Sequence, residues 1–130
     1  MSLEVGLEST VEATVDEEMT AEAVGSGDVP VLATPWLLAL VERAEVEGLS
    51  GRLGEGETSV GAAVELQHLA PTPVGAPVMA RVRLVSVGDR SIDFEFEASD
   101  RRGPVARGRH RRVVVDRESF LGSARDRHAR

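Results

Sequence analysis

Three side chains in this sequence have types and positions that suit acid–base or nucleophilic chemistry: Thr34, Glu42 and His68. Thr34 begins the strongest helical pattern, as the predicted N-cap ahead of Pro35. Glu42 lies within the same helix among leucines and valines, where burying a carboxylate is costly unless it is paired. His68 is the last residue on the apolar face of a predicted strand. A helix cap, a surface glutamate paired with an arginine and a core histidine are the plain alternatives, and none of the three residues is specific alone.

The spacing of Thr34 and Glu42 limits how they can share a site. Eight residues of helix separate their backbones by about 12 Å, so the two side chains cannot touch directly. A site that uses both needs an extended substrate that bridges them or a second copy of the chain. We therefore predict a two-fold homodimer, with the helix start of one subunit beside the carboxylate of the other.

Composition narrows the chemistry. The 130 residues are 42% hydrophobic and 28% charged, which is typical of a folded protein. We predict one domain over residues 1–122 and a flexible C-terminal tail over 123–130. The chain has no cysteine, lysine or tyrosine, which excludes thiolate, Schiff-base and phenolic chemistry. The three histidines stand far apart at 68, 110 and 128, so no metal site is predicted, and His110 is left without a role.

Charge and hydropathy also limit the partners. The net charge of −7 argues against nucleic-acid binding. No apolar run approaches the roughly 20 residues that span a bilayer, and the acidic start lacks a signal-peptide pattern, so we expect no membrane association and a cytoplasmic location. Residues 1–57 hold only two of the 15 arginines. The arginine-rich second half fits either a local anion site or a solvated surface.

The elements that must position these residues follow from periodicity. Alternation predicts a strand over 5–15, and helical spacing predicts a short acidic helix over 16–24 and a long helix over 34–47. Further strands are predicted from 60 to 68, 77 to 87, 92 to 98 and 105 to 115. Val60, Ala62, Val64 and Leu66 would share one face with His68. An α+β fold follows, in which an antiparallel meander of four strands, preceded by one strand, wraps around the long helix.

These residues together resemble the fluoroacetyl-CoA thioesterase family of hotdog proteins. The resemblance covers roughly residues 24–115 and rests on the joint spacing of Ala33-Thr34, Glu42, Gly61, His68, Pro71-Thr-Pro-Val-Gly75 and Arg107-Gly-Arg-His-Arg-Arg112. It implies a hotdog fold, with the antiparallel sheet wrapped around one central helix. It also implies hydrolysis of an acyl-CoA thioester, with CoA as part of the substrate and no separate cofactor.

The resemblance also implies roles for individual residues. Thr34, Glu42 and His68 would form the catalytic set at a dimer interface, with His68 as the base for hydrolysis and the Thr34 hydroxyl near free helix amides that suit an oxyanion. Glu42 would either attack the thioester carbonyl or activate water, and the sequence leaves both open. Gly61 matches a glycine beside the acyl or pantetheine part.

The last strand contributes two arginines by the same resemblance. Arg107 and Arg112 match family arginines, and guanidinium groups suit the phosphates of CoA. The alternative is that the arginines of this strand only keep it soluble and bind no ligand.

One segment departs from the family pattern. Characterised fluoroacetyl enzymes carry phenylalanines just before the Ala-Thr pair, whereas residues 25–32 here contain no aromatic residue. A mobile, less selective loop is expected, and the substrate is predicted to be a small or medium acyl-CoA. A hotdog hydratase or dehydratase and a non-catalytic acyl-CoA-binding module are the alternative functions.

Overall fold

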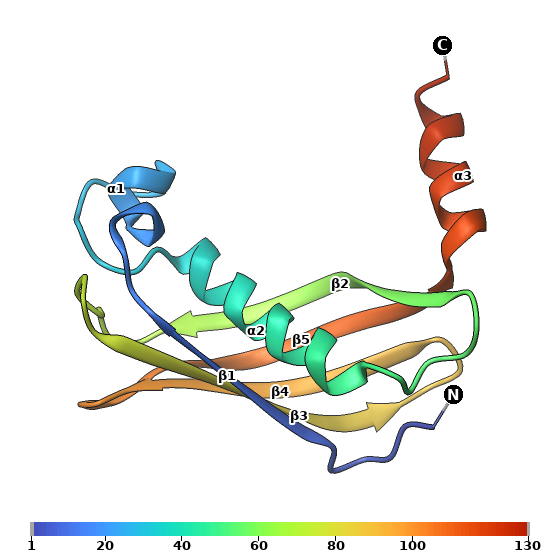
Figure 1. Ribbon diagram of the computed structural model, residues 1–130, viewed down its shortest axis with the longest axis horizontal. Coiled ribbons are helices and arrows are strands. Elements are labelled where there is room, and N and C mark those ends of the chain that lie inside the picture. The colour runs from blue at the N-terminus through green and yellow to red at the C-terminus, as the bar shows by residue number, and fades with distance from the viewer. Residues whose placement is uncertain (1, 130) are drawn as a thin grey trace.

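A five-stranded antiparallel sheet curls around one long helix in the computed structural model, which describes residues 2–129 (Figure 1). The α+β hotdog arrangement predicted from the sequence is confirmed. The strands are β1 (Glu8–Thr14), β2 (Glu57–His68), β3 (Pro77–Val87), β4 (Ser91–Asp100) and β5 (Gly103–Asp116). The helices are η1 (Glu17–Met19, a 3-10 turn), α1 (Ala21–Val24), α2 (Thr34–Leu49) and α3 (Arg117–Arg127).

The strand order corrects the predicted meander. The order is β1-β3-β4-β5-β2, so β2 pairs with β5 at one edge, and only β3, β4 and β5 form a meander. The connection from β2 to β3 contains Pro71 and Pro73, which do not suit a tight hairpin. It passes the start of α2 instead, where the carbonyl of Thr72 accepts a hydrogen bond from the amide of Leu32 at 2.9 Å. This crossing places β2 and β3 on opposite sides of the β4–β5 pair.

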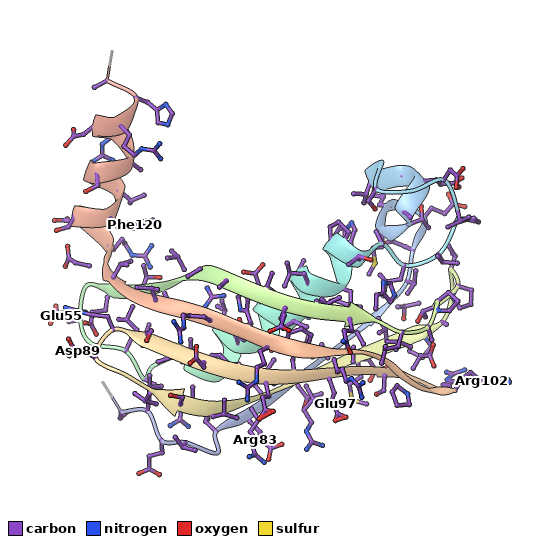
Figure 2. All side chains as sticks on the ribbon, turned by 180° about the vertical axis from the view of Figure 1, so that it is seen from behind. Glu55, Arg83, Asp89, Glu97, Arg102 and Phe120 are labelled. Atoms are coloured by element: carbon purple, nitrogen blue, oxygen red, sulfur yellow. The ribbon has the colours of Figure 1, made fainter. Side chains whose placement is uncertain are left out.

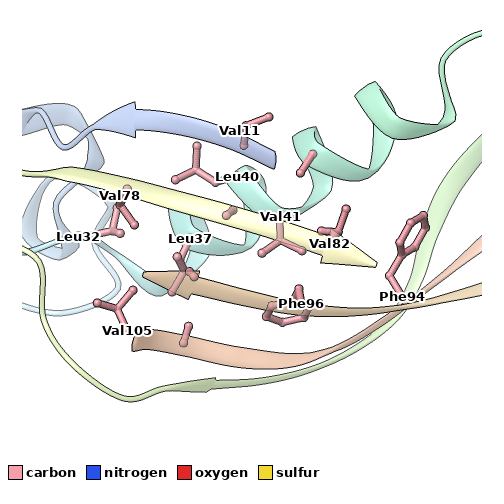
Figure 3. Packing of buried hydrophobic residues seen from close by; sticks show 14 of the residues in the cluster. Val11, Leu32, Leu37, Leu40, Val41, Val78, Val82, Phe94, Phe96 and Val105 are labelled. Atoms are coloured by element: carbon pink, nitrogen blue, oxygen red, sulfur yellow. The ribbon is translucent and has the colours of Figure 1, made fainter. Parts of the chain in front are cut away.

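The core lies between α2 and the inner face of the sheet (Figure 3). Buried side chains of α2, among them Leu37, Leu40 and Val41, pack against inward-facing residues of the central strands such as Val82 and Phe96. Full burial of one such side chain stabilises the fold by about 1.5–3 kcal/mol. Because α2 packs mainly on β1 and β3, the edge strand β2 stays largely exposed.

A β-bulge in β2 changes which residues share its inner face. Gly61 pairs with Arg112 and Val64 pairs with His110, so one extra residue lies between these two pairs. Paired residues of an antiparallel ladder lie on the same face, and the bulge therefore brings Gly61 onto the face of Val64 and His68. Strict alternation had predicted Val60 and Ala62 on that face.

Helix α3 extends into the segment predicted as the C-terminal tail, and the division into a domain over 1–122 and a flexible tail stays a prediction. Residues 123–127, expected in a loose tail, continue α3, which Figure 1 shows standing away from the sheet. Asp116 caps this helix by accepting a hydrogen bond from the amide of Ser119 at 3.0 Å, and none of its described side chains is buried. Arg130 lies outside the described residues. Within residues 2–129, no helix is long and apolar enough to cross a membrane.

Candidate active site

Thr34 and His68 meet at the start of α2. The Thr34 hydroxyl oxygen lies 2.8 Å from Nδ1 of His68. The N-cap is Ala33, whose backbone is extended, so the prediction that Thr34 caps the helix is wrong. The amide of Ala33 is bonded to the carbonyl of Met19 at 2.8 Å, which fixes where the helix begins. Thr34 is thus the first helical residue, and its hydroxyl bonds His68 instead of the helix end.

His68 is a neutral imidazole at neutral pH. Burial lowers its pKa below the ordinary value of 6.5, because the charged form loses water. Its Nε2 atom is buried and has no hydrogen-bond partner among the described residues. A neutral imidazole with one uncommitted nitrogen can accept a proton.

The helix buries a different glutamate from the one predicted. The Glu42 side chain is 37% exposed, whereas Glu45, expected on the exposed arc, has a fully buried side chain. Glu45 follows Leu37 and Val41 at helical spacing and therefore shares their inward-facing side. Glu42 lies at the edge of that side and reaches the surface between α2 and β2.

Glu45 is held by two basic side chains of β5. Its Oε1 atom lies 2.6 Å from Nδ1 of His110 and 3.2 Å from Nη1 of Arg112. Arg112 also donates from Nε to the Ser59 hydroxyl at 2.9 Å and from Nη2 to the Ser59 carbonyl at 3.1 Å. Both partners go to Oε1, whereas Oε2 of Glu45 is buried without a hydrogen-bond partner among the described residues, so the carboxylate is only partly compensated for its burial.

Glu42 lies next to this buried cluster. Its Oε2 atom is 3.5 Å from Nη1 of Arg112 and 3.6 Å from Nε2 of His110. A Cβ atom added at Gly61 would lie 2.7 Å from the same oxygen and 3.1 Å from Nε2 of His110. The missing side chain of Gly61 therefore keeps the space in which Glu42 and His110 face each other.

The structure brings some of the predicted site residues together and separates others. Thr34 and His68 are in contact, and Glu42, Gly61 and Arg112 form a second group further along α2. Within residues 2–129, no hydrogen bond or ion pair joins the two groups, in agreement with the helix spacing. Sequence reasoning missed Glu45 and His110. His110 alternates with Arg112 on β5, and that spacing on one strand face was the available signal.

Arg107 lies on the other face of the sheet. Its Nε atom donates to Oε1 of Gln67 at 3.1 Å, and the side chain is exposed. It lines a shallow outer cavity of about 520 Å³ with other charged residues of the sheet, including Arg83 and Glu97, which Figure 2 labels. The two arginines predicted to bind CoA phosphates thus point to opposite faces of the sheet. They are an odd number of positions apart on one strand, and side chains alternate between the two faces. The binding role of Arg107 stays a prediction.

Metal binding has no support in the described part of the chain. Within residues 2–129, no group of three or more His, Cys, Asp or Glu side chains is placed to hold a metal ion.

Comparison with known proteins assigns the family. Residues 15–118 match the model of the fluoroacetyl-CoA-specific thioesterase family. The chain belongs to this family. The fluoroacetyl-CoA thioesterase of Streptantibioticus cattleyicolor is 33% identical over 97 residues, which cover 75% of this chain and 70% of that protein. The chain is therefore a thioesterase, as the sequence analysis predicted.

Solved structures agree with this assignment. A variant of the fluoroacetyl-CoA-specific thioesterase superposes with a TM-score of 0.90 at 28% identity, covering 98% of each chain. A Thermus thermophilus member of the thioesterase superfamily gives 0.91 at 28% identity, covering 98% of this chain and 95% of that one. A hot-dog-like protein from Thermanaerovibrio acidaminovorans gives 0.87 at 28% identity, covering 95% and 91%.

Proposed function

We propose that this thioesterase hydrolyses a small or medium acyl-CoA, with Thr34, Glu42 and His68 as its catalytic residues. The observation that carries the proposal is the placement of the reactive groups on the facing sides of α2 and β2. Thr34, Leu38 and Glu42 are spaced four residues apart and share one face of α2. The inner face of β2, with Gly61 and His68, lies opposite.

Glu42 and His68 divide the chemistry in this proposal. A Glu42 oxygen attacks the thioester carbonyl, the carbon–sulfur bond breaks, and CoA leaves as a thiolate that takes up a proton. Water then attacks the resulting anhydride while Nε2 of His68 accepts its proton, which releases the acid and restores the Glu42 carboxylate. The alternative route, in which Glu42 activates water that attacks the thioester directly, uses the same groups.

Thr34 suits the negative charge that develops on the carbonyl oxygen. When Nε2 of His68 is the base, its Nδ1–H donates to the Thr34 hydroxyl oxygen, and the hydroxyl hydrogen is left to donate elsewhere. The first amides of α2 have no partner within the helix, and the positive end of the helix dipole favours an oxyanion there. The start of α2 therefore supplies donors of the kind that stabilise a tetrahedral intermediate.

A homodimer would bring the two groups to one thioester. Strand β2 is 12 residues long, pairs on one side with β5, and leaves its other edge unpaired in the single chain. Val64 on its inner face is 46% exposed. Long exposed edge strands normally need covering. Antiparallel pairing of β2 with β2 of a second copy would cover the unpaired edge of β2 in each copy.

The symmetry of such a pair supports an active site that both copies share. A two-fold axis near Val64, midway between Gly61 and His68, reverses the strand direction. It would set the Thr34–His68 pair of one copy beside Gly61 and Glu42 of the other. The 12 Å that separates Thr34 from Glu42 along one helix would then no longer keep them apart.

The acyl specificity is proposed to be broader than that of the named relative. That relative is a fluoroacetyl-CoA thioesterase, and a variant of the family enzyme has been solved with acetyl-CoA. Residues 25–32 of this chain contain no aromatic side chain that could close over a fluoroacetyl group. We expect several short and medium acyl-CoA esters to be hydrolysed. A preference for fluoroacetyl-CoA over acetyl-CoA above about a hundredfold, or about 2.7 kcal/mol, would contradict this.

Release of free CoA from a panel of acyl-CoA esters tests the proposed function. Glu42→Gln, which keeps the shape and removes the charge, should lower kcat by about a thousandfold or more. Single turnover in heavy-oxygen water distinguishes the two routes, because label enters the Glu42 carboxylate only if an anhydride forms. Turnover that survives Glu42→Gln would show that another group does the chemistry.

Single introduced cysteines test the dimer. The natural chain has none, so a disulfide between two copies reports only on the introduced residue. We expect oxidative cross-linking from one of Ala63→Cys, Val64→Cys or Glu65→Cys, and none from Arg83→Cys on the outer face. A fully active monomer in sedimentation would contradict the shared active site.

A further inference from the structure

The buried Glu45–His110 pair has no part in the mechanism above, yet it lies directly behind Glu42. Glu45 is fully buried and His110 is 4% exposed. Buried ion pairs often contribute little to stability compared with apolar residues of similar size. Their position next to the reactive carboxylate points to a role in the reaction.

The two nitrogens of His110 face two different carboxylates. Nδ1 lies 2.6 Å from Oε1 of Glu45, and Nε2 lies 3.6 Å from Oε2 of Glu42. A carboxylate behind a histidine fixes the orientation of the ring and the position of its proton. The Nδ1–H bond to Glu45 therefore aims Nε2 at Glu42.

The charges of the cluster balance when His110 is an imidazolium ion. Glu42 and Glu45 from α2 bring two negative charges, and Arg112 from β5 brings one positive charge near both of them. The other neighbours of His110 on the adjacent strands carry no charge: Gly61 and the ladder partner Val64 on β2, and the ladder partner Phe94 on β4. An Nε2–H that points at Glu42 supplies the missing positive charge.

The two oxygens of Glu42 are held differently. The contacts that Glu42 makes with His110 and Arg112 both go to Oε2. Within residues 2–129, no hydrogen bond or ion pair engages Oε1 of Glu42. Gly61 leaves room for this arrangement, since any Cβ there would meet Oε2 and His110 together.

We propose that Glu45 and His110 form a positioning dyad in which a doubly protonated His110 holds Oε2 of Glu42 and leaves Oε1 free to react. This proposal rests on the role proposed for Glu42. His110 is too buried to touch a substrate and acts through Glu42, as does Glu45 one step further back.

Nitrogen NMR tests the protonation state without relying on turnover. The chain has only three histidines, so single substitutions of His68 and His128 assign the signals of His110 in the whole protein. We expect both nitrogens of His110 to carry protons at pH 7 in the wild type, and one of them to lose its proton in Glu45→Gln. A neutral His110 in the wild type would overturn the proposal.

Kinetics of two matched variants test the positioning role. Asn at position 110 reaches only toward Glu45, whereas Gln is long enough to offer an N–H toward Glu42. We expect His110→Asn to lower kcat by about 10- to 100-fold, with KM for the acyl-CoA within about threefold, and His110→Gln to recover part of that loss.

The results separate this proposal from the one on which it rests. If Glu42→Gln keeps normal turnover, the role of Glu42 is wrong, and the nitrogen signals still decide the state of His110. If Glu42→Gln is inactive but a folded His110→Asn has wild-type kcat, only the dyad is wrong. Should His110→Asn fail to fold, Glu45→Gln carries the kinetic test, with an expected loss of about tenfold and the same overturning result.

Discussion

The two histidines that lie beside α2, His68 and His110, have opposite surroundings. At the start of α2, His68 contacts an exposed hydroxyl, and burial lowers its pKa, which favours the neutral form. Near the middle of α2, His110 lies between two carboxylates and beside an arginine. The first environment suits a group that takes up a proton during the reaction. The second suits a group that keeps its proton and holds a neighbour in place.

The comparison also shows how burial distributes function along one helix. Glu42 and Glu45 are the same residue type three positions apart, yet only the Glu42 side chain reaches the surface. The exposed member is free to react, and the buried member can act only on side chains around it. A difference of less than one helical turn therefore separates a candidate catalytic residue from a positioning residue.

The largest effect expected from a small change is at Gly61, which lies beside Glu42 and His110. Gly61→Ala would place a methyl group 2.7 Å from Oε2 of Glu42. Glu42 is a flexible side chain at the surface and can move aside, so the fold should hold while kcat falls by about a hundredfold.

Gly122→Ala in α3 is the matched control, because its added Cβ meets nothing within 4 Å. Thermal unfolding and kcat should both stay near or above the wild-type values there. Normal activity in Gly61→Ala would show that the geometry of Glu42 does not limit turnover.

A smaller effect on kcat is expected at the start of α2, where Thr34 contacts His68. Thr34→Val removes the hydroxyl that contacts His68, and we expect kcat to fall by about tenfold, whereas Thr34→Ser should stay close to wild type. Steady-state CoA release measures both. Equal activity of the two variants would exclude a role for the hydroxyl.

The acid dependence should follow His68. The neutral form is the base, and its pKa is below 6.5, so the low-pH limb of kcat/KM should lie below pH 6.5. Because the pKa of His68 is lower in the folded protein, the unfolded chain binds a proton at His68 more readily. The contribution of His68 to the free energy of unfolding is therefore fully present above pH 6.5. It falls as the pH drops toward the folded pKa. His68→Gln should remove this part of the pH dependence in denaturant titrations. A limb above pH 6.5 would contradict the assignment.

The smallest effect is expected on the outer face of the sheet. Arg107→Ala removes one exposed guanidinium, and an exposed ion pair is worth about 0.2–1 kcal/mol, so KM for acyl-CoA should rise by about 1.4-fold to fivefold with kcat unchanged. The KM of CoA esters at low and high salt measures this. An unchanged KM would show that Arg107 is a surface residue without a role in binding CoA esters.

Local patterns were enough to find most of the elements. Alternation located β3 at 77–87 in full and the other strands within a few residues, because side chains on a half-buried strand repeat every two residues. Helical spacing located α2 and the distance between Thr34 and Glu42. The family resemblance named Thr34, Glu42 and His68 as one set, and the structure brings two of them, Thr34 and His68, into contact.

Only the tertiary structure decided which polar groups are buried together. The bulge that turns Gly61 toward Glu42, the exchange of buried and exposed roles between Glu42 and Glu45, and the pairing of Glu45 with His110 depend on how α2 lies across the sheet. A sequence pattern records periodicity within one element. The environment of a charge is set by groups from other elements, here β2 and β5, which folding brings within a few ångströms of each other.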